Sequence, residues 1–221
     1  MEILSKILAP IIWAMEKLLL LFEGITGSMG LSILCVSLTF ALLLVPIRKI
    51  AERFEARIGA RMSAAAEDVA IAKQTLKGEA LFDETERIYK RHGYHPIQSI
   101  GMGASFFISL PILLGALVLF STSPLLEGES FLMVQDLSKP DGILGPINLL
   151  PILMSAVTIV DARIRFKDDR SARVRFYIIA AVLFALVYTL ASGLVLYWTM
   201  SNLFALVFAL FVSPKTPAEV A

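Results

Sequence analysis

The sequence contains a single cysteine, Cys35, so no disulfide can form within the chain. Charged residues are also scarce, at 18% of 221 residues, where soluble domains average about 25%. Hydrophobic residues make up 57% of the chain. This balance indicates a polytopic, all-α membrane protein and excludes an ordinary soluble domain.

The chain also lacks the motifs of an enzyme. It has no glycine-rich phosphate loop and no nucleophile beside a base, so neither catalysis nor a cofactor is predicted. His92 and His95 have H-x-x-H spacing, but two ligands interrupted by Gly93 favour a surface role over a metal site. Direct nucleic-acid binding is not predicted either, because the net charge is only +1 and the main basic segment carries nearly as many acids.

What charge there is concentrates in residues 48–96, which hold ten Lys/Arg and eight Asp/Glu between long apolar runs. A block of this kind cannot enter hydrocarbon, so it is predicted to be an aqueous insert between two spans. Gly78 divides it into an amphipathic helix and a second helix over 79–92, which together predict a helical hairpin. The apolar stripe of the first helix repeats every fourth residue, at Ile50, Phe54, Ile58 and Met62.

The apolar runs predict five transmembrane helices around this hairpin. They cover residues 29–47, 97–120, 145–160, 176–190 and 192–212. Residues 1–28 mix apolar side chains with charges of both signs, which favours a retained interfacial helix and linker over a span or a cleaved signal. The remaining segments are a loop at 121–144, a basic loop at 161–175 and a short tail at 213–221.

The distribution of basic residues predicts the orientation. The hairpin and the 161–175 loop hold sixteen of the twenty Lys/Arg, and five spans place both on one side of the membrane. The positive-inside rule makes that side cytoplasmic. The N-terminus and the 121–144 loop are therefore predicted outside, and the C-terminus inside.

Several motifs in this order resemble those of one family. SGLVLYWTMSNLF at 192–204 resembles the last span of the YidC/Oxa/Alb membrane protein insertases, and DLSKPD at 136–141 resembles their outer loop. YKRHGYHPIQS followed by FFISLPILLGAL is similar to their passage from the hairpin into the second span. The resemblance implies a bacterial inner-membrane insertase and chaperone that passes nascent apolar segments through a hydrophilic groove into the lipid bilayer. Its implied partners are nascent membrane proteins and lipid, with the ribosome or the Sec translocon as further candidates.

The chain departs from this family at one position. Family members typically carry an arginine in the groove five residues before the proline that ends the first span, and Ala41 stands there. The groove is then predicted to be wetted by neutral groups. Its candidate residues, with Ala41, are Ser37, Thr39, Ser105, Ser109, Asn148, Ser155, Tyr197, Trp198, Ser201 and Asn202, beside Thr158 and Thr199.

Alternatives remain open at several of these positions. Hydroxyls in spans often bond to their own helix or join neighbouring helices, and Tyr197 and Trp198 also suit core packing. Arg48 lies two helical turns beyond Ala41, and helical side chains lean toward the N-terminus, so it is a candidate for the groove mouth; the alternative is a lipid anchor. Without the groove arginine, a scaffold protein that keeps the fold but inserts nothing is the second functional hypothesis.

Overall fold

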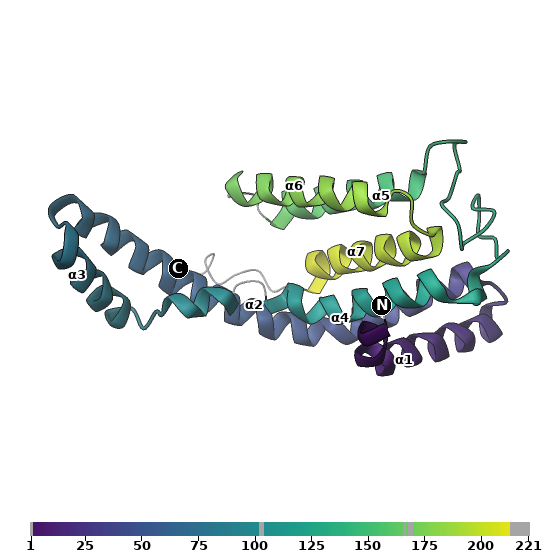
Figure 1. Ribbon diagram of the computed structural model, residues 1–221, viewed down its shortest axis with the longest axis horizontal. Helices are drawn as coiled ribbons and strands as arrows, with labels where there is room; N and C mark the ends of the chain where they lie inside the picture. Colours follow the sequence, from purple (N-terminus) through teal and green to yellow (C-terminus); the bar gives the residue numbers. More distant parts are fainter. Residues whose placement is uncertain (1, 102–103, 166, 168–169, 213–221) are drawn as a thin grey trace. The chain divides into compact units, whose positions relative to one another are not determined.

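The computed structural model describes residues 2–101, 104–165, 167 and 170–212, and for some helical residues, Glu52 and Ser105 among them, the backbone alone. The described residues are helical, without strands and with two isolated β-bridges (Figure 1). The helices are α1 Glu2–Thr26, α2 Met29–Thr75, α3 Gly78–Arg91, α4 Ala104–Thr122, α5 Leu149–Arg165, α6 Arg170–Val187 and α7 Ser192–Val212, with 3-10 turns at Pro96–Gly101 and Pro124–Leu126. The all-α class predicted from the sequence is confirmed.

Only α2, among the described residues, is both long and apolar enough to cross a membrane. Residues 108–122, 176–187 and 192–208 form shorter apolar helical stretches. Each predicted span overlaps one of these helices, while the number of spans in a membrane stays a prediction. α5 starts four residues later than its apolar run suggested, where the carboxylate of Asp141 accepts from its first N–H groups. α6 starts six residues earlier than its apolar run, at Arg170.

The helix α2 runs without interruption through Pro46, so one helix carries both the first apolar run and the first half of the charged block. The sequence suggested a division there. A proline removes only its own N–H donor and crowds the carbonyl four residues earlier. The hydrogen bonds on either side are sufficient to continue the helix.

The helix α1 is also longer than the apolar run that predicted it. Residues 23–26 are helical, and the break is confined to Gly27 and Ser28. Gly27 has a φ of +67°, a conformation that glycine adopts without steric cost. Its N–H donates to the carbonyl of Glu23 at 2.8 Å and closes the last helical turn.

The chain divides into two compact units, one formed by Met1–Val45 with Pro111–Ala221 and the other by Pro46–Leu110. In the first unit, α1 buries Met15 and Leu19 in a core that also contains Ile33 of α2 and Leu194 of α7. Ile7, Trp13, Leu21 and Ile25 of α1 stay exposed. One face of α1 thus packs on the bundle and the other remains apolar, a pattern that suits contact with lipid.

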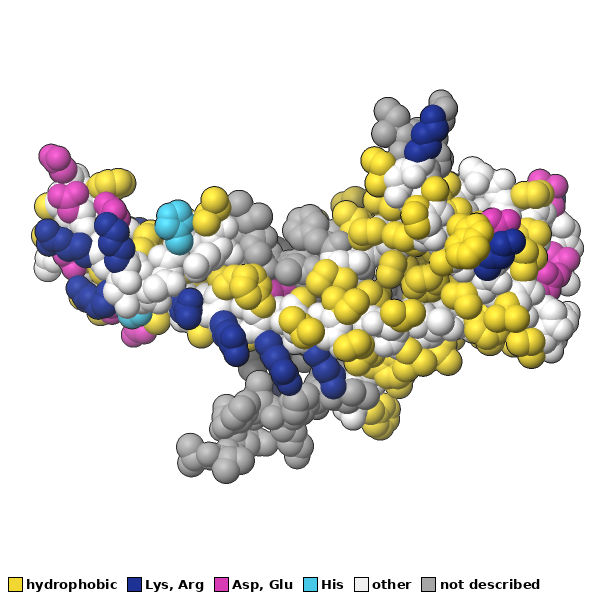
Figure 2. Space-filling view, turned by 90° about the horizontal axis from the view of Figure 1, so that it is seen from below, with side chains coloured by type: hydrophobic (Ala, Val, Ile, Leu, Met, Phe, Trp, Pro, Cys, Tyr) yellow, Lys and Arg dark blue, Asp and Glu magenta, His cyan; other side chains and the backbone are white. Residues whose placement is uncertain are grey.

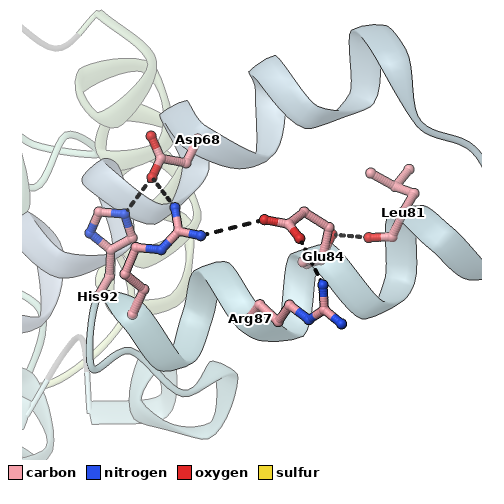
Figure 3. A network of polar contacts seen from close by, with 7 residues as sticks. Asp68, Leu81, Glu84, Arg87 and His92 are labelled. Atoms are coloured by element: carbon pink, nitrogen blue, oxygen red, sulfur yellow. Dashed lines mark hydrogen bonds and ion pairs between the residues drawn. The ribbon is translucent and has the colours of Figure 1, made fainter.

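The second unit is a helical hairpin made of the C-terminal half of α2 and of α3 (Figure 1). Its small core contains Ile58, Ala65, Val69, Ile88 and Tyr94. Figure 3 shows how polar contacts at Asp68 close the hairpin: His92 Nε2 lies 2.7 Å from one of its oxygens, and Arg91 Nη1 lies 3.9 Å from the same oxygen. His92 thus joins the end of α3 to a carboxylate of the opposite helix.

Candidate functional site

The helices α5 and α7 pack against each other in the first unit and carry polar side chains where they meet. Asn202 Nδ2 donates to Thr158 Oγ1 at 3.4 Å, and Thr158 Oγ1 donates to the carbonyl of Met154 at 2.9 Å. Ser155 precedes Thr158 by one turn, and Ser201 precedes Asn202 by one residue. We call Ser155, Thr158, Ser201 and Asn202 the α5–α7 polar cluster.

Two hydroxyls of this cluster are buried and unsatisfied. Neither Ser155 Oγ nor Ser201 Oγ has a hydrogen-bond partner within the described part of the chain. A buried polar atom left in this way costs about 1–3 kcal/mol, so native structures normally fill such places with water or a ligand. With hydroxyls and an amide but no base or carboxylate, the cluster can donate and accept hydrogen bonds and can do no acid–base chemistry.

The predicted groove residues of α2 turn their hydroxyls into the helix itself. Ser37 Oγ donates to the carbonyl of Ile33 at 2.6 Å, and Thr39 Oγ1 donates to that of Cys35 at 2.8 Å. Ala41 is buried. Thr199 of α7 likewise bonds to its own helix. These hydroxyls are satisfied as donors and keep only acceptor lone pairs.

The two aromatic candidates lie in the hydrophobic core. Tyr197 is 2% exposed, and its ring centroid is 5.5 Å from that of Phe120 on α4. Trp198 is half-buried against the same core. Their positions favour packing, the alternative that the sequence left open.

Asn148 lies just before α5 and joins the α4–α5 loop to the end of α6. Its Nδ2 donates to the carbonyl of Tyr188 at 2.7 Å, and its Oδ1 accepts from the N–H of Gly142 at 3.0 Å. Asn148 is therefore separate from the α5–α7 polar cluster and holds the loop in place.

The hairpin unit brings together two further predicted residues. Arg48 Nη2 donates to Ser109 Oγ at 3.0 Å, across sixty-one positions of sequence. The candidate for the groove mouth thus contacts a candidate groove residue of α4. The side chain of Ser105, one turn earlier, lies outside the described part of the structure.

Sequence reasoning missed the polar contacts that order the α4–α5 loop. The buried carboxylate of Asp141 accepts from the N–H groups of Leu149 and Leu150 at 2.8 and 3.0 Å, so it caps α5. A helix N-terminus favours such a negative charge. An aspartate between a proline and a glycine, shortly before an apolar run, was the signal in the sequence.

Asp136, at the start of the DLSKPD motif, is the second ordering residue. Lys139 Nζ lies 2.6 Å from one of its oxygens, and the Ser138 hydroxyl donates to the other at 2.6 Å. The bonds from Lys139 and then Ser138 hold the pKa of Asp136 well below its usual range, and the same pair raises the pKa of Lys139. The motif is thus a folded turn.

This motif is pinned to the tight turn between α6 and α7. The N–H of Ser192 donates to the carbonyl of Lys139 at 2.7 Å, and the N–H of Gly193 donates to that of Leu137 at 2.9 Å. A Cβ at Gly193 would stand only 3.1 Å from this carbonyl oxygen, so glycine permits the approach. We call the contacts of Asp136, Leu137, Lys139, Asp141, Ser192 and Gly193 the loop junction.

A basic pocket lies where α5 and α6 connect. It is lined by Arg163, Arg170, Arg173, Val174 and Tyr177. Arg163 Nε donates to the hydroxyl of Tyr177 at 3.3 Å. None of these residues belongs to the predicted groove. The three arginines fall in the 161–175 segment that the sequence predicted as a basic loop, but they lie in α5 and α6.

Comparison with known proteins places this arrangement in a family. Residues 21–219 match the family model described as 60Kd inner membrane protein. The insertase named YidC of Chlorobium luteolum is 29% identical over 150 residues, covering 62% of this chain and 25% of that protein. YidC 1 of Streptococcus pyogenes serotype M3 is 27% identical over 82% of this chain and 65% of its own length. YidC 1 of Halalkalibacterium halodurans is 27% identical over 95% and 78%.

The chain spans about a quarter of the Chlorobium relative and just under two thirds of the Streptococcus relative. The family match, by contrast, extends over nearly the whole chain, from the end of α1 through α7. It contains all the predicted groove residues and the loop junction. The chain therefore belongs to the 60Kd inner membrane protein family, the YidC/Oxa/Alb family of membrane protein insertases.

Proposed function

We propose that this protein is a membrane protein insertase and chaperone of the bacterial inner membrane, which receives nascent apolar segments in a polar groove and releases them sideways into the bilayer. Family membership supports the proposal, because the relatives described above are named membrane protein insertases. The proposed partners are nascent membrane proteins and lipid, with the ribosome or the Sec translocon delivering the nascent chain. The activity needs no cofactor and no catalytic group.

The α5–α7 polar cluster is the observation that carries this proposal. Moving the polar flank of a substrate through hydrocarbon costs several kcal/mol, and water or polar side chains along the path lower that cost. Ser155 and Ser201 offer unsatisfied hydroxyls among apolar helices. Such groups are costly in a closed core and useful in a wet groove, because water or a substrate backbone can bond to them.

We extend the groove from this cluster to the other predicted polar residues. Ser37 and Thr39 retain acceptor lone pairs after bonding to their own helix, and their contribution is correspondingly weaker. The contacts of Asn148 and Tyr197 support a packing role. The strongest groove candidates of the first unit are thus Ser155, Ser201 and Asn202, while Ser105 and Ser109 of the second unit are retained as candidates from the sequence.

Arg48 is proposed to supply positive charge at the groove mouth. Its hydrogen bond to Ser109 holds the guanidinium against a hydroxyl of α4, which supports this role over a simple lipid anchor. The charge enters from the helix end rather than from the middle of the span, where Ala41 stands. Clients with strongly acidic flanks are therefore expected to insert less efficiently than neutral ones.

The proposed topology has five spans, with the N-terminus outside and the hairpin and C-terminus in the cytoplasm. The concentration of Lys/Arg in the hairpin and in the α5–α6 connection supports it. The loop junction would then close the outer end of the bundle. A groove that is sealed outside and open inside can accept a chain without leaking ions.

A second candidate function is a scaffold that keeps the insertase fold without inserting clients. Ala41 favours it, because this position carries no charge and is buried. The internal hydrogen bonds of Ser37 and Thr39 favour it as well, since they leave α2 with no free donor at those two positions.

Complementation separates the two functions. The chain and its Ala41→Arg variant are expressed in bacteria depleted of their own insertase, and insertion of a single-span substrate with an acidic outer segment is followed. Rescue by the unaltered chain is expected and establishes an insertase with a neutral groove. Rescue only by Ala41→Arg favours the scaffold, and no rescue by either variant, with both in the membrane, rejects the insertase.

The cluster itself is tested in the same assay. Ser155→Ala with Ser201→Ala should lower insertion severalfold, because the groove loses two groups that hold water. Ser37→Ala is the comparison variant, since its hydroxyl is already bonded to its own helix and its loss should lower insertion much less. Equal effects of the two variants would remove the cluster from the proposal.

A further inference from the structure

A line of basic side chains follows α2 directly after Pro46. Lys49, Arg53, Arg57 and Arg61 recur at intervals of four residues, and four residues advance a helix by slightly more than one turn. The four side chains therefore share one face, over a length of about 18 Å at 1.5 Å per residue. Figure 2 shows Lys and Arg side chains in a row along this part of the molecule. We call these four residues the basic stripe.

The basic stripe lacks internal neutralisation. No ion pair or hydrogen bond joins Lys49, Arg53 or Arg57 to another described residue, and Arg61 donates only to the carbonyl of Gly93, at 3.3 Å. Glu55, two residues from both Arg53 and Arg57, is turned by roughly 160–200° from them to another face of the helix. Like charges four residues apart destabilise a helix, so this arrangement weakens α2 unless an anionic surface lies against it.

Exposed apolar side chains border the stripe on one side. Ile50 is 68% exposed and Phe54 52% exposed, although both belong to the apolar stripe that the sequence assigned to helix packing. The hairpin core uses Ile58, one turn further along, and leaves these two uncovered. A face that joins a row of cations to a large aliphatic and an aromatic side chain is typical of helices that lie at a membrane interface.

We propose that the basic stripe binds anionic lipid headgroups, so that the part of α2 after Pro46 lies on the cytoplasmic membrane surface with Ile50 and Phe54 inserted among the lipids. The cations complement the lipid phosphates, and basic clusters beside a span are attracted to anionic leaflets. The exposed side chains of Ile50 and Phe54 favour lipid over RNA as the ligand, because RNA phosphates offer such side chains no apolar surface. This proposal does not rest on insertase activity.

Pro46 suits this role. It cannot donate to the carbonyl of Leu42, so the helix lacks one hydrogen bond where the apolar run ends and the stripe begins. Proline positions are where helices bend most readily. The boundary between the two compact units falls at this residue, so the part of α2 that carries the stripe belongs to the second unit.

Lipid quenching in nanodiscs tests the proposal on the full-length chain. In a Cys35→Ser background, a fluorophore is attached at Ala60→Cys, an exposed position within the stripe, or at Ala66→Cys, an exposed position about 240° further round the helix. Quenching by spin-labelled headgroups should be stronger at position 60 than at 66 in anionic discs. It should weaken in zwitterionic discs and at 1 M salt, where the Debye length is about 3 Å instead of about 10 Å.

Charge-removal variants sharpen the result. The stripe variant combines Lys49→Gln, Arg53→Gln and Arg57→Gln and should abolish the preference for anionic discs. The control variant combines Lys73→Gln, Lys77→Gln and Lys90→Gln. It removes equal charge elsewhere in the hairpin and should preserve that preference. Glutamine is a good helix former, and circular dichroism verifies the helix. Equal quenching in both lipids, or no effect of the stripe variant, overturns the proposal. The proposal is also overturned if added ribosomal RNA shields the fluorophore at position 60 while anionic lipid does not.

Discussion

The loop junction and the α5–α7 polar cluster are two polar regions of the same compact unit, and they differ in how their polar atoms are satisfied. At the loop junction, the carboxylates of Asp136 and Asp141 each accept three or more bonds from described groups. In the cluster, the hydroxyls of Ser155 and Ser201 accept and donate none. A satisfied network holds a structure in one conformation, whereas unsatisfied buried groups mark a place that water or a client can occupy.

The largest effect is expected from Asp141→Ala. The variant leaves the N–H groups of Leu149, Leu150 and Ile143 without their acceptor, and it should lower the free energy of unfolding by about 2–4 kcal/mol. Thermal unfolding in detergent, followed by circular dichroism, measures the loss. The exposed Asp83→Ala in the hairpin is the control, and an equal effect there would deny the junction its structural role.

A somewhat smaller loss is expected from Gly193→Ala. The added Cβ would lie 2.9 Å from Leu126 Cδ1 and 3.1 Å from the carbonyl oxygen of Leu137. The backbone oxygen cannot easily move, so the cost should be about 1–3 kcal/mol. Gly24→Ala, with open space around its Cβ, should instead be neutral or slightly stabilising. A tolerated Gly193→Ala would mean that the loop is not held closely to the α6–α7 turn.

A weaker, pH-dependent effect is expected from Asp136. Its pKa is lower in the folded chain than in the unfolded chain, so the stabilisation is complete above the unfolded value of 3.8 and is lost as pH falls through the lower folded value. The effect should be small because Lys139 is exposed and water screens the pair. Unfolding temperatures measured from about pH 6 to pH 2 should fall less steeply for Asp136→Asn, and parallel curves would contradict this account.

The smallest stability change is expected in the cluster. The double variant Ser155→Ala with Ser201→Ala removes two unsatisfied hydroxyls. Its free energy of unfolding should therefore differ from that of the unaltered chain by no more than about 1 kcal/mol, in the direction of either lower or higher stability. The serine double variant should impair insertion while leaving the fold intact, whereas Asp141→Ala should destabilise the fold. A large loss of stability would show that the two hydroxyls are structural.

Some of this architecture was predictable from local pattern. The helical hairpin followed from a four-residue apolar repeat interrupted by Gly78, and Ile58 of that repeat does enter the hairpin core. The repeat did not reveal that Ile50 and Phe54 remain exposed. Periodicity identifies the face of a helix, and only the length of the opposing helix decides how much of that face is covered.

The candidate site was predicted less completely. Residue type and spacing selected Ser155, Ser201 and Asn202, and Asn202 does meet Thr158 across two helices. Spacing could not show that Ser37 and Thr39 bond within α2 or that Asn148 belongs to the loop junction side of the bundle. A hydroxyl has equally good partners in its own helix and in a neighbour, so side-chain conformation and packing decide between them.

The sequence by itself determined that the chain is helical, where its charge is concentrated and that its motifs belong to this insertase family, because hydropathy, periodicity and motif order are properties of the sequence alone. Tertiary structure decided which polar atoms are satisfied. It joined Arg48 to Ser109, closed Asp141 onto the start of α5 and left Ser155 and Ser201 without partners. These outcomes depend on which helices pack together and at what rotation, and no local pattern contains that information.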